Sequence, residues 1–172
     1  MTMLLYHENP TTTWYHVLMQ RPDWPEYFMN LAQVVATRGN CLLLQVGTVL
    51  VKDRRIIATG YNGTPMGLPN CTEDGCPRCA KKHKNLIKSG EEKGFCLCVH
   101  AEVNAILQSA YHGVSTRGSV LYATHSPCML CAKEILNAGI IEVYYLHKDL
   151  GETESLQLLT QHLAKVQQVG HV

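Results

Sequence analysis

The spacing of apolar side chains predicts a helix followed by two strands in the first third of the chain. From Asp23 onward, apolar residues recur at helical spacing, Pro25 suits the first helical turn, and Gly39 ends the helix. Two short segments rich in β-branched side chains follow, at 46–51 and 55–59. The polar residues between them are typical of a hairpin turn, so we expect the sheet to open with two antiparallel strands.

The second half of the chain returns to regular alternation after residue 100. The predicted elements are a helix over 101–111, a strand over 119–123, a helix over 129–138, a strand over 140–146 and a helix over about 153–166. The last helix has Leu156, Leu159 and Leu163 as its inward stripe, and the strand before it is apolar enough to be buried on both faces. This alternation predicts an α/β fold in which one sheet carries helices on both faces.

The middle of the chain, residues 60–99, shows little periodicity. It holds five glycines before residue 91 and five of the eight cysteines. A loop this long is uncommon inside a compact domain unless something holds it in place. A bound metal ion would replace the apolar core that this segment lacks, so we expect metal binding here.

The composition is that of an ordinary globular protein. The 172 residues fit one domain, with an irregular arm at 1–22 and a cysteine-rich insertion at 62–98. No apolar run is long enough for a membrane span, and the first residues lack the apolar stretch of a signal peptide, so we expect a cytoplasmic protein without a membrane partner. The formal net charge of +1 gives no general attraction for nucleic acid, and we expect the basic residues of the insertion to be a solvated face. These residues are Arg78, Lys81, Lys82, Lys84, Lys88 and Lys93.

Two short motifs carry the candidate chemistry. The first is His-Ala-Glu at 100–102, and the second is Ser-Pro-Cys-Met-Leu-Cys at 126–131. Together they match the H-x-E…P-C-x-x-C pattern of zinc deaminases. A catalytic zinc takes three protein ligands and leaves one position for water, and His100, Cys128 and Cys131 supply that set. Both motifs fall at predicted helix starts, which favours the thiolate form of the cysteines.

Glu102 is the predicted proton carrier. It follows His100 by two residues, so we do not expect it to point at the metal as a fourth ligand. Its expected place is beside the zinc-bound water, whose pKa zinc lowers to about 7. Glu102 would take the proton of that water, pass it to the pyrimidine ring nitrogen and then protonate the departing amine, so that attack on C4 of cytosine gives uracil and ammonia. A structural zinc site would instead need a fourth protein ligand and has no use for a neighbouring carboxylate.

The chain resembles the dCMP deaminase family of the cytidine deaminase-like fold. The resemblance covers about residues 24–148 and, beyond the zinc motifs, includes the segments 46–51, 57–65, 76–79 and 96–102. It implies a three-layer α-β-α fold with a five-stranded mixed sheet, usually assembled as a homo-hexamer. It also implies a small-molecule substrate, with deamination of dCMP to dUMP as the leading activity. In regulated members of the family, dCTP activates and dTTP inhibits.

The resemblance also implies roles for individual residues. Asn62 falls where relatives hold the sugar of the nucleotide. The expected substrate contacts are Asn62, Thr48, Ala101, Ser126 and Pro127. The expected effector contacts, with Mg²⁺ accompanying the nucleotide, are Gly60, Tyr61, Asn62 and Gly63. From the residues alone, this last stretch equally suits a strand-ending turn, because glycine and asparagine both tolerate positive φ.

Many relatives carry a second, structural zinc that joins the long loop to the body of the domain. The positions that match its ligands best are Cys41, Cys71 and Cys98. The candidates for the fourth ligand are Cys79, Cys76 and Cys96, and spacing does not choose between them. At least two of these six cysteines are then expected to be free buried thiols, unless a further metal is bound.

Two departures from the family pattern bear on the substrate. Tyr111 stands where some relatives have an arginine linked to nucleotide recognition, and Thr48 replaces a common alanine. Turnover of dCTP, alone or together with dCMP, is therefore an alternative. A nucleoside cytidine deaminase would not need the long insertion, and a tRNA adenosine deaminase is expected to be more basic than this chain. A non-catalytic nucleotide-binding module has no need of Glu102.

Overall fold

The computed structural model describes residues 21–88, 90–149 and 151–170, so nearly all of the predicted arm at 1–22 lies outside the described residues. The helices and strands are α2 (Trp24–Ala36), β1 (Gly47–Lys52), β2 (Arg55–Tyr61), α3 (Pro77–His83), α4 (Ala101–Tyr111), β3 (Val120–His125), α5 (Met129–Asn137), β4 (Glu142–His147), α6 (Thr153–His162) and β5 (Lys165–Gln168). Two short 3₁₀ turns, Cys71–Glu73 and Lys93–Phe95, flank α3. No helix in these described ranges is long and apolar enough to cross a membrane.

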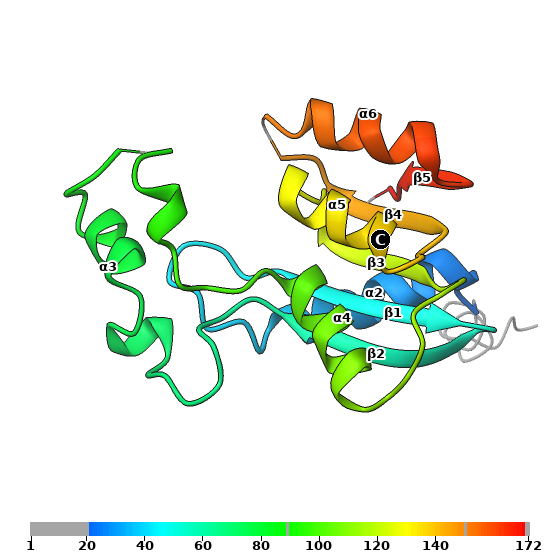
Figure 1. Cartoon of the computed structure of the whole chain (residues 1–172), viewed down its shortest axis with the longest axis horizontal. Helices are drawn as coiled ribbons and strands as arrows, with labels where there is room; N and C mark the ends of the chain where they lie inside the picture. The colour runs from blue at the N-terminus through cyan, green and yellow to red at the C-terminus, as the bar shows by residue number, and fades with distance from the viewer. Residues whose placement is uncertain (1–20, 89, 150, 171–172) are drawn as a thin grey trace, which may run out of the picture.

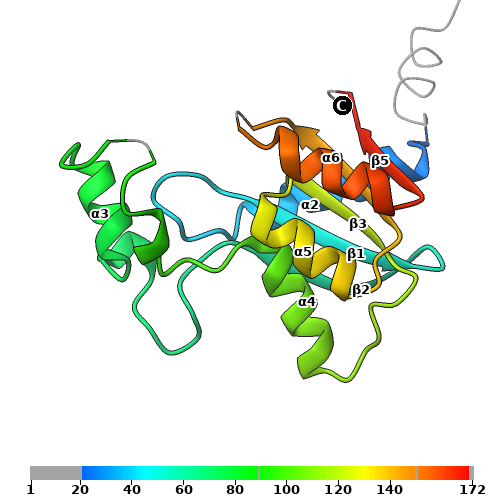
Figure 2. The ribbon, with the colours of Figure 1, turned by 45° about the horizontal axis from the view of Figure 1, so that its top comes forward.

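The five strands form one mixed sheet in the order β2-β1-β3-β4-β5. Strand β1 is antiparallel to both β2 and β3, whereas β3, β4 and β5 run parallel. Helix α2 covers one face of the sheet, and α4, α5 and α6 cover the other (Figures 1 and 2). The predicted three-layer α/β fold with a five-stranded mixed sheet is therefore confirmed.

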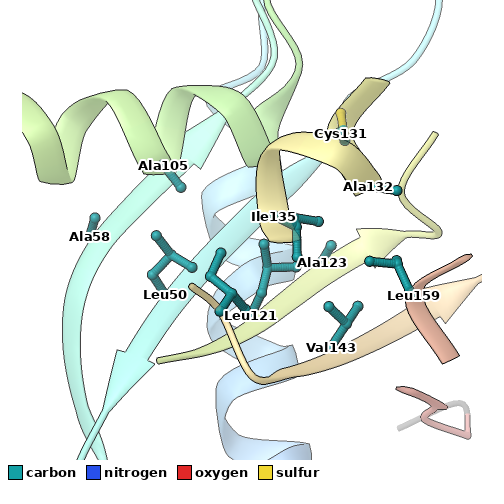
Figure 3. Packing of buried hydrophobic residues seen from close by; sticks show 11 residues of the cluster. Leu50, Ala58, Ala105, Leu121, Ala123, Cys131, Ala132, Ile135, Val143 and Leu159 are labelled. Atoms are coloured by element: carbon teal, nitrogen blue, oxygen red, sulfur yellow. The ribbon is translucent and has the colours of Figure 1, made fainter. Parts of the chain in front are cut away.

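Alternate residues of the inner strands build the core beneath α4, α5 and α6. Leu50 of β1, Leu121 of β3 and Val143 of β4 are fully buried and pack with Ile135 of α5 and Leu159 of α6 (Figure 3). Fully burying an aliphatic side chain of this kind stabilises a fold by roughly 1.5–3 kcal/mol. Because a shift of one residue would turn these side chains to the other face, this core also fixes the register of the sheet.

Aromatic side chains build the core on the opposite face, beneath α2. The N-cap residue Asp23 starts this helix by accepting a hydrogen bond from the backbone N–H of Glu26 at 2.8 Å. Phe28 then packs on Tyr122 of β3, which stacks on Tyr144 of β4 with 4.9 Å between ring centroids. Strand β4 thus has buried residues on both faces, as its apolar sequence predicts.

The end of the chain differs from its prediction. The last helix stops at His162, and 165–168 forms the edge strand β5 instead of a final helical turn. The backbone turns extended at Leu163, and the N–H of Ala164 donates to the carbonyl of Ile141 at 3.0 Å. Pairing with β5 satisfies the backbone N–H and C=O groups along the edge of β4. These groups would have no strand partner if the helix continued to residue 166.

The insertion at 62–98 forms a lobe that projects from one end of the sheet (Figures 1 and 2). It contains α3, although its weak periodicity predicts no regular element. Pro77 explains the helix start, because proline suits the first helical turn, where an N–H has no intrahelical partner. The lobe has large apolar side chains on its surface, with Phe95 75% exposed and Leu86 70% exposed, so apolar burial is not what holds it together.

Two glycines let the helices approach the sheet closely. A Cβ atom on Gly60 would lie 2.1 Å from the carbonyl oxygen of Ala101, and one on Gly47 would lie 2.2 Å from that of Ala32. The interpretation of 60–63 as a turn with positive φ is wrong: Gly60 lies inside β2, and no residue of the stretch has positive φ. The physical requirement for Gly60 is close contact with α4 rather than an unusual backbone conformation.

We predict that Gly47→Ala destabilises the fold, because the new methyl group would overlap the backbone of α2. Overpacking of this kind costs roughly 1–3 kcal/mol, so the midpoint of urea unfolding should fall. The matched control is Gly94→Ala, where an added Cβ has no neighbour within 4 Å. Equal midpoints for the two variants would contradict the packing argument.

Candidate active site

The starts of α4 and α5 bring the two sequence motifs together. His100 is the N-cap of α4 and Cys128 is the N-cap of α5, both in extended conformation. The amide of Asn104 holds α4 in place by donating to the carbonyl oxygen of Tyr61 at the end of β2, at 2.8 Å. The hydroxyl of Ser155 on α6 donates to the carbonyl oxygen of Pro127 at 2.7 Å, which fixes the turn that leads into α5.

Three donor atoms converge at this point. The Nδ1 atom of His100 lies 3.4 Å from the Sγ of Cys128 and 3.3 Å from the Sγ of Cys131, and the two sulfurs are 3.5 Å apart. Ligands around one tetrahedral zinc ion are separated by roughly 3.5–3.8 Å, given Zn–N and Zn–S bonds of about 2.0 and 2.3 Å. The donor set and its spacing therefore fit Zn²⁺ with three protein ligands and one open position.

The electrostatics of the cluster favour a thiolate. Hydrogen bonding with Cys131, and then with His100, lowers the pKa of Cys128 to about 3. The same contact with Cys128 raises the pKa of His100 to about 9. The N-terminal end of α5 adds positive potential, because its first backbone N–H groups have no intrahelical partner. A thiolate is the form in which cysteine binds a metal.

Glu102 lies in the first turn of α4 beside the cluster. Its side chain is almost completely buried, with 4% of its surface exposed. Burial raises the pKa of this carboxyl group to about 7, because desolvation disfavours the charged form. A carboxyl group with a pKa near neutrality is suited to both accept and release a proton.

A cavity of about 220 Å³ opens onto the cluster. Its lining includes His100, Glu102 and Cys128, together with Cys41 and three cysteines of the insertion, Cys79, Cys96 and Cys98. The remaining lining residues are Leu43, Leu44, Val46, Asn62, Arg78, Ala101, His125, Ser126, Asp149 and Glu152. The cavity is thus shared between the sheet domain and the projecting lobe.

The structure separates the residues predicted to contact substrate into two groups. Asn62, Ala101 and Ser126 line the cavity, whereas Thr48 and Pro127 are buried outside its lining. The Asn62 amide is engaged with the backbone, since Oδ1 accepts from the N–H of Val46 at 2.9 Å and Nδ2 donates to the carbonyl of Leu44 at 2.7 Å. The hydroxyl of Thr48 is fully buried beneath α4 and finds no hydrogen-bond partner among the described residues.

Sequence analysis missed four polar residues of the cavity: Arg78, His125, Asp149 and Glu152. Arg78 belongs to the basic residues expected to form a solvated face, but the start of α3 carries it to the cavity. Its Nε donates to the carbonyl oxygen of Glu91 at 3.1 Å. His125 is the last residue of β3, and Asp149 and Glu152 follow β4; the only signal for these three was their position after the predicted strands.

Cys41, Cys71 and Cys98, the best-matching candidates for a second zinc, lie together with Cys79, one of the three candidates for the fourth ligand. The Sγ atoms of Cys41, Cys71, Cys79 and Cys98 lie within 4.8 Å of one another. A second group of four, formed by Cys76, Cys79, Cys96 and Cys98, meets the same condition. All eight cysteines of the chain are free thiols. Four sulfur donors are a ligand set that structural Zn²⁺ sites use.

A mixed sheet with one histidine and two cysteines at adjoining helix starts defines the zinc-binding deaminases as a class. Residues 22–147 match the cytidine and deoxycytidylate deaminase zinc-binding region, and the chain belongs to that family.

Several proteins that are similar to this chain are deoxycytidylate deaminases. The chain is 46% identical over 125 residues to one from Schizosaccharomyces pombe, covering 73% of this chain and 37% of that protein. It is 42% identical over 130 residues to one from Mycobacterium phage D29, covering 74% of this chain and 97% of that protein. The dCMP deaminase of cyanophage S-TIM5, solved in complex with dCMP and dUMP, matches with a TM-score of 0.69 and 32% identity over 87% of this chain and 99% of that one. The chain spans less than half the length of the yeast proteins that it matches.

We predict that His100→Ala lowers the zinc content by one ion per chain, because two thiolates alone do not complete the three-ligand set. The measurement is elemental analysis of the purified chain. His125→Ala is the matched control, since His125 lines the same cavity but stands outside the cluster. Unchanged zinc in the His100 variant would contradict the assignment of this ligand.

Proposed function

We propose that this chain, as a single deaminase domain, hydrolyses the 4-amino group of dCMP to give dUMP and ammonia. The observation that carries the proposal is a buried carboxyl group, Glu102, beside a three-donor cluster that opens onto a cavity. A structural metal site would use a fourth protein ligand, whereas three ligands leave a position for a reactant.

His100, Cys128 and Cys131 would hold the zinc ion. When bound there, zinc supplies a water molecule acidified to a pKa of about 7. Glu102 accepts a proton from the attacking water on a carboxylate oxygen and delivers it to N3 of the pyrimidine. The carboxylate then accepts the remaining proton of that water, now on the C4 hydroxyl group, and gives it to the amino group as ammonia leaves, so its own protonation state is restored.

The choice of dCMP rests on the cavity and on the relatives. The S. pombe and phage D29 proteins are deoxycytidylate deaminases, and the S-TIM5 enzyme was solved with dCMP and dUMP bound. Arg78 is the one arginine or lysine that lines the cavity among the described residues, and a guanidinium group matches the geometry of a phosphate. We assign Arg78 to the 5′-phosphate of the nucleotide. The competing substrate is dCTP, which carries a longer phosphate chain.

We predict that Glu102→Gln lowers the rate of ammonia release from dCMP by at least about 100-fold, because general acid–base catalysis contributes roughly 10²–10⁴-fold. The zinc content should stay unchanged, since Glu102 is not a ligand. Glu154→Gln, on the exposed start of α6, is the control and should keep full activity.

The same assay compares dCMP, dCTP and deoxycytidine as substrates for the wild-type chain. Faster turnover of dCMP than of the other two supports the proposal. Faster turnover of dCTP would replace the proposed substrate, and the absence of turnover with all three would overturn the proposed activity.

We predict that Arg78→Gln raises KM for dCMP by roughly 10-fold or more, because a hydrogen bond to a charged group contributes about 1.5–3 kcal/mol. The KM for deoxycytidine, which has no phosphate, should change little. Lys84→Gln, just past the end of α3 and outside the cavity lining, serves as the control. An equal rise in both KM values for the Arg78 variant would show that the residue does not recognise the phosphate.

We propose that Cys41 and three cysteines of the insertion, Cys71, Cys79 and Cys98, hold a structural zinc. Their sulfur atoms form one of the two compact groups of four in the lobe. The surface position of Phe95 and Leu86 supports this role, because a lobe with so little apolar burial needs another source of stability.

We also propose that nucleotide effectors, dCTP as activator and dTTP as inhibitor with Mg²⁺ bound to their phosphates, act at residues 60–63. The close contact of Gly60 with α4 supports this, as does the pairing of Gly63 with Val99 through hydrogen bonds of 2.8 and 3.2 Å. Both contacts lie next to His100, so a shift in this stretch would move the cluster.

We further propose that the chain forms a homo-oligomer such as a hexamer. Exposed apolar side chains on β2 and α4, among them Tyr61 and Tyr111, support this assembly.

A further inference from the structure

Six cysteines in and beside the lobe form two overlapping groups rather than one. The first group contains Cys41 and Cys71, and the second contains Cys76 and Cys96. Two further cysteines, Cys79 and Cys98, belong to both groups. Within each group every sulfur lies within 4.8 Å of the other three. The six sulfurs therefore outline two sites of four ligands each, and the two sites have Cys79 and Cys98 in common.

The individual contacts follow the same division. The thiols of Cys41 and Cys71 each interact with the thiols of Cys79 and Cys98. From the other side, the Sγ of Cys96 lies 3.8 Å from that of Cys79 and 3.9 Å from that of Cys76, and Cys96 also interacts with Cys98. The shared pair thus stands between the two unshared pairs.

One metal ion cannot account for all six thiols. A tetrahedral ion takes four sulfur ligands, so a single zinc in either group leaves two thiols without a metal. The thiols left over by the group proposed above would be those of Cys76 and Cys96. Cys76 has no exposed surface, and the cluster around it consists of cysteines and Leu42. The lobe therefore has no apolar core in which two spare thiols would serve as packing.

Backbone donors are placed on both sides of the group. The N–H of Leu42 donates to the Sγ of Cys71 at 3.4 Å, and the N–H of Leu97 donates to the Sγ of Cys76 at 3.3 Å. One unshared sulfur on each side thus accepts a backbone hydrogen bond.

We propose that the lobe binds two zinc ions in one binuclear thiolate cluster, with Cys79 and Cys98 bridging the two metals. Cys41 and Cys71 complete the first tetrahedral site, and Cys76 and Cys96 complete the second. Six thiols release six protons to solvent and every cysteine of the lobe becomes a ligand. The cluster replaces the missing apolar core and forms part of the lining of the candidate active-site cavity, to which Cys41, Cys79, Cys96 and Cys98 belong.

The first test counts zinc in two forms of the full chain. The double variant Cys128→Ser, Cys131→Ser removes the proposed catalytic ligands and leaves the lobe intact. We expect three zinc ions per chain in the wild type and two in the double variant. One zinc ion in the double variant would overturn the binuclear cluster while leaving a mononuclear site. Two ions in the wild type together with two in the double variant would locate the error in the catalytic site instead.

The second test asks whether the two ions share ligands. The double variant is loaded with ¹¹³Cd²⁺ and studied by NMR, in which cysteine β-protons couple to the metal that their sulfur binds. We expect two cadmium signals, with the β-protons of Cys79 and Cys98 coupled to both and those of the other four cysteines coupled to one. A single signal, or two signals without a shared cysteine, would overturn the proposal.

Discussion

The close packing of α4 on β2 is the constraint on which the candidate active site depends. Gly60 has no side chain, so the backbone of α4 lies directly against the strand, and Asn104 ties the helix to the end of that strand. This contact fixes the position of α4 relative to the sheet. It thereby fixes the position of His100 at the helix start and of Glu102 in the buried first turn. A helix displaced by the width of one methyl group would move both residues away from Cys128 and Cys131.

The same helix starts that position the donors also favour their chemistry. Hydrogen bonding with Cys131 and then with His100, together with the unpaired N–H groups at the first turn of α5, stabilises negative charge on the Cys128 sulfur, while burial disfavours it on Glu102. Neighbouring groups are thereby pushed in opposite directions, with the pKa of Cys128 near 3 and that of Glu102 near 7. The fold thus gives neighbouring side chains opposite charge preferences, which suits Cys128 to bind a metal and Glu102 to carry a proton.

Most of the fold could be predicted from periodicity, and the exceptions have physical causes. The pattern identifies α2, α4, α5 and four strands, because each buries one apolar face or stripe. It misses β5, since Lys165–Gln168 carries little apolar pattern and becomes a strand through backbone pairing alone. It also misses α3, which is held by cysteines rather than by an apolar stripe. The two motifs predict which residues form the three-donor cluster, but not Arg78 or Asp149, whose position depends on how distant loops meet around the cavity.

The three-donor cluster also joins two halves of the sheet that have different architecture. His100 follows the antiparallel hairpin β1–β2, whereas Cys128 and Cys131 follow β3, at the beginning of the parallel part. A metal ion held by all three would act as a cross-link between these halves, closing a loop of 28 residues between His100 and Cys128. Such a link restricts the unfolded chain as well as completing the active site. Metal binding would therefore be thermodynamically coupled to the docking of the two halves, and each would favour the other.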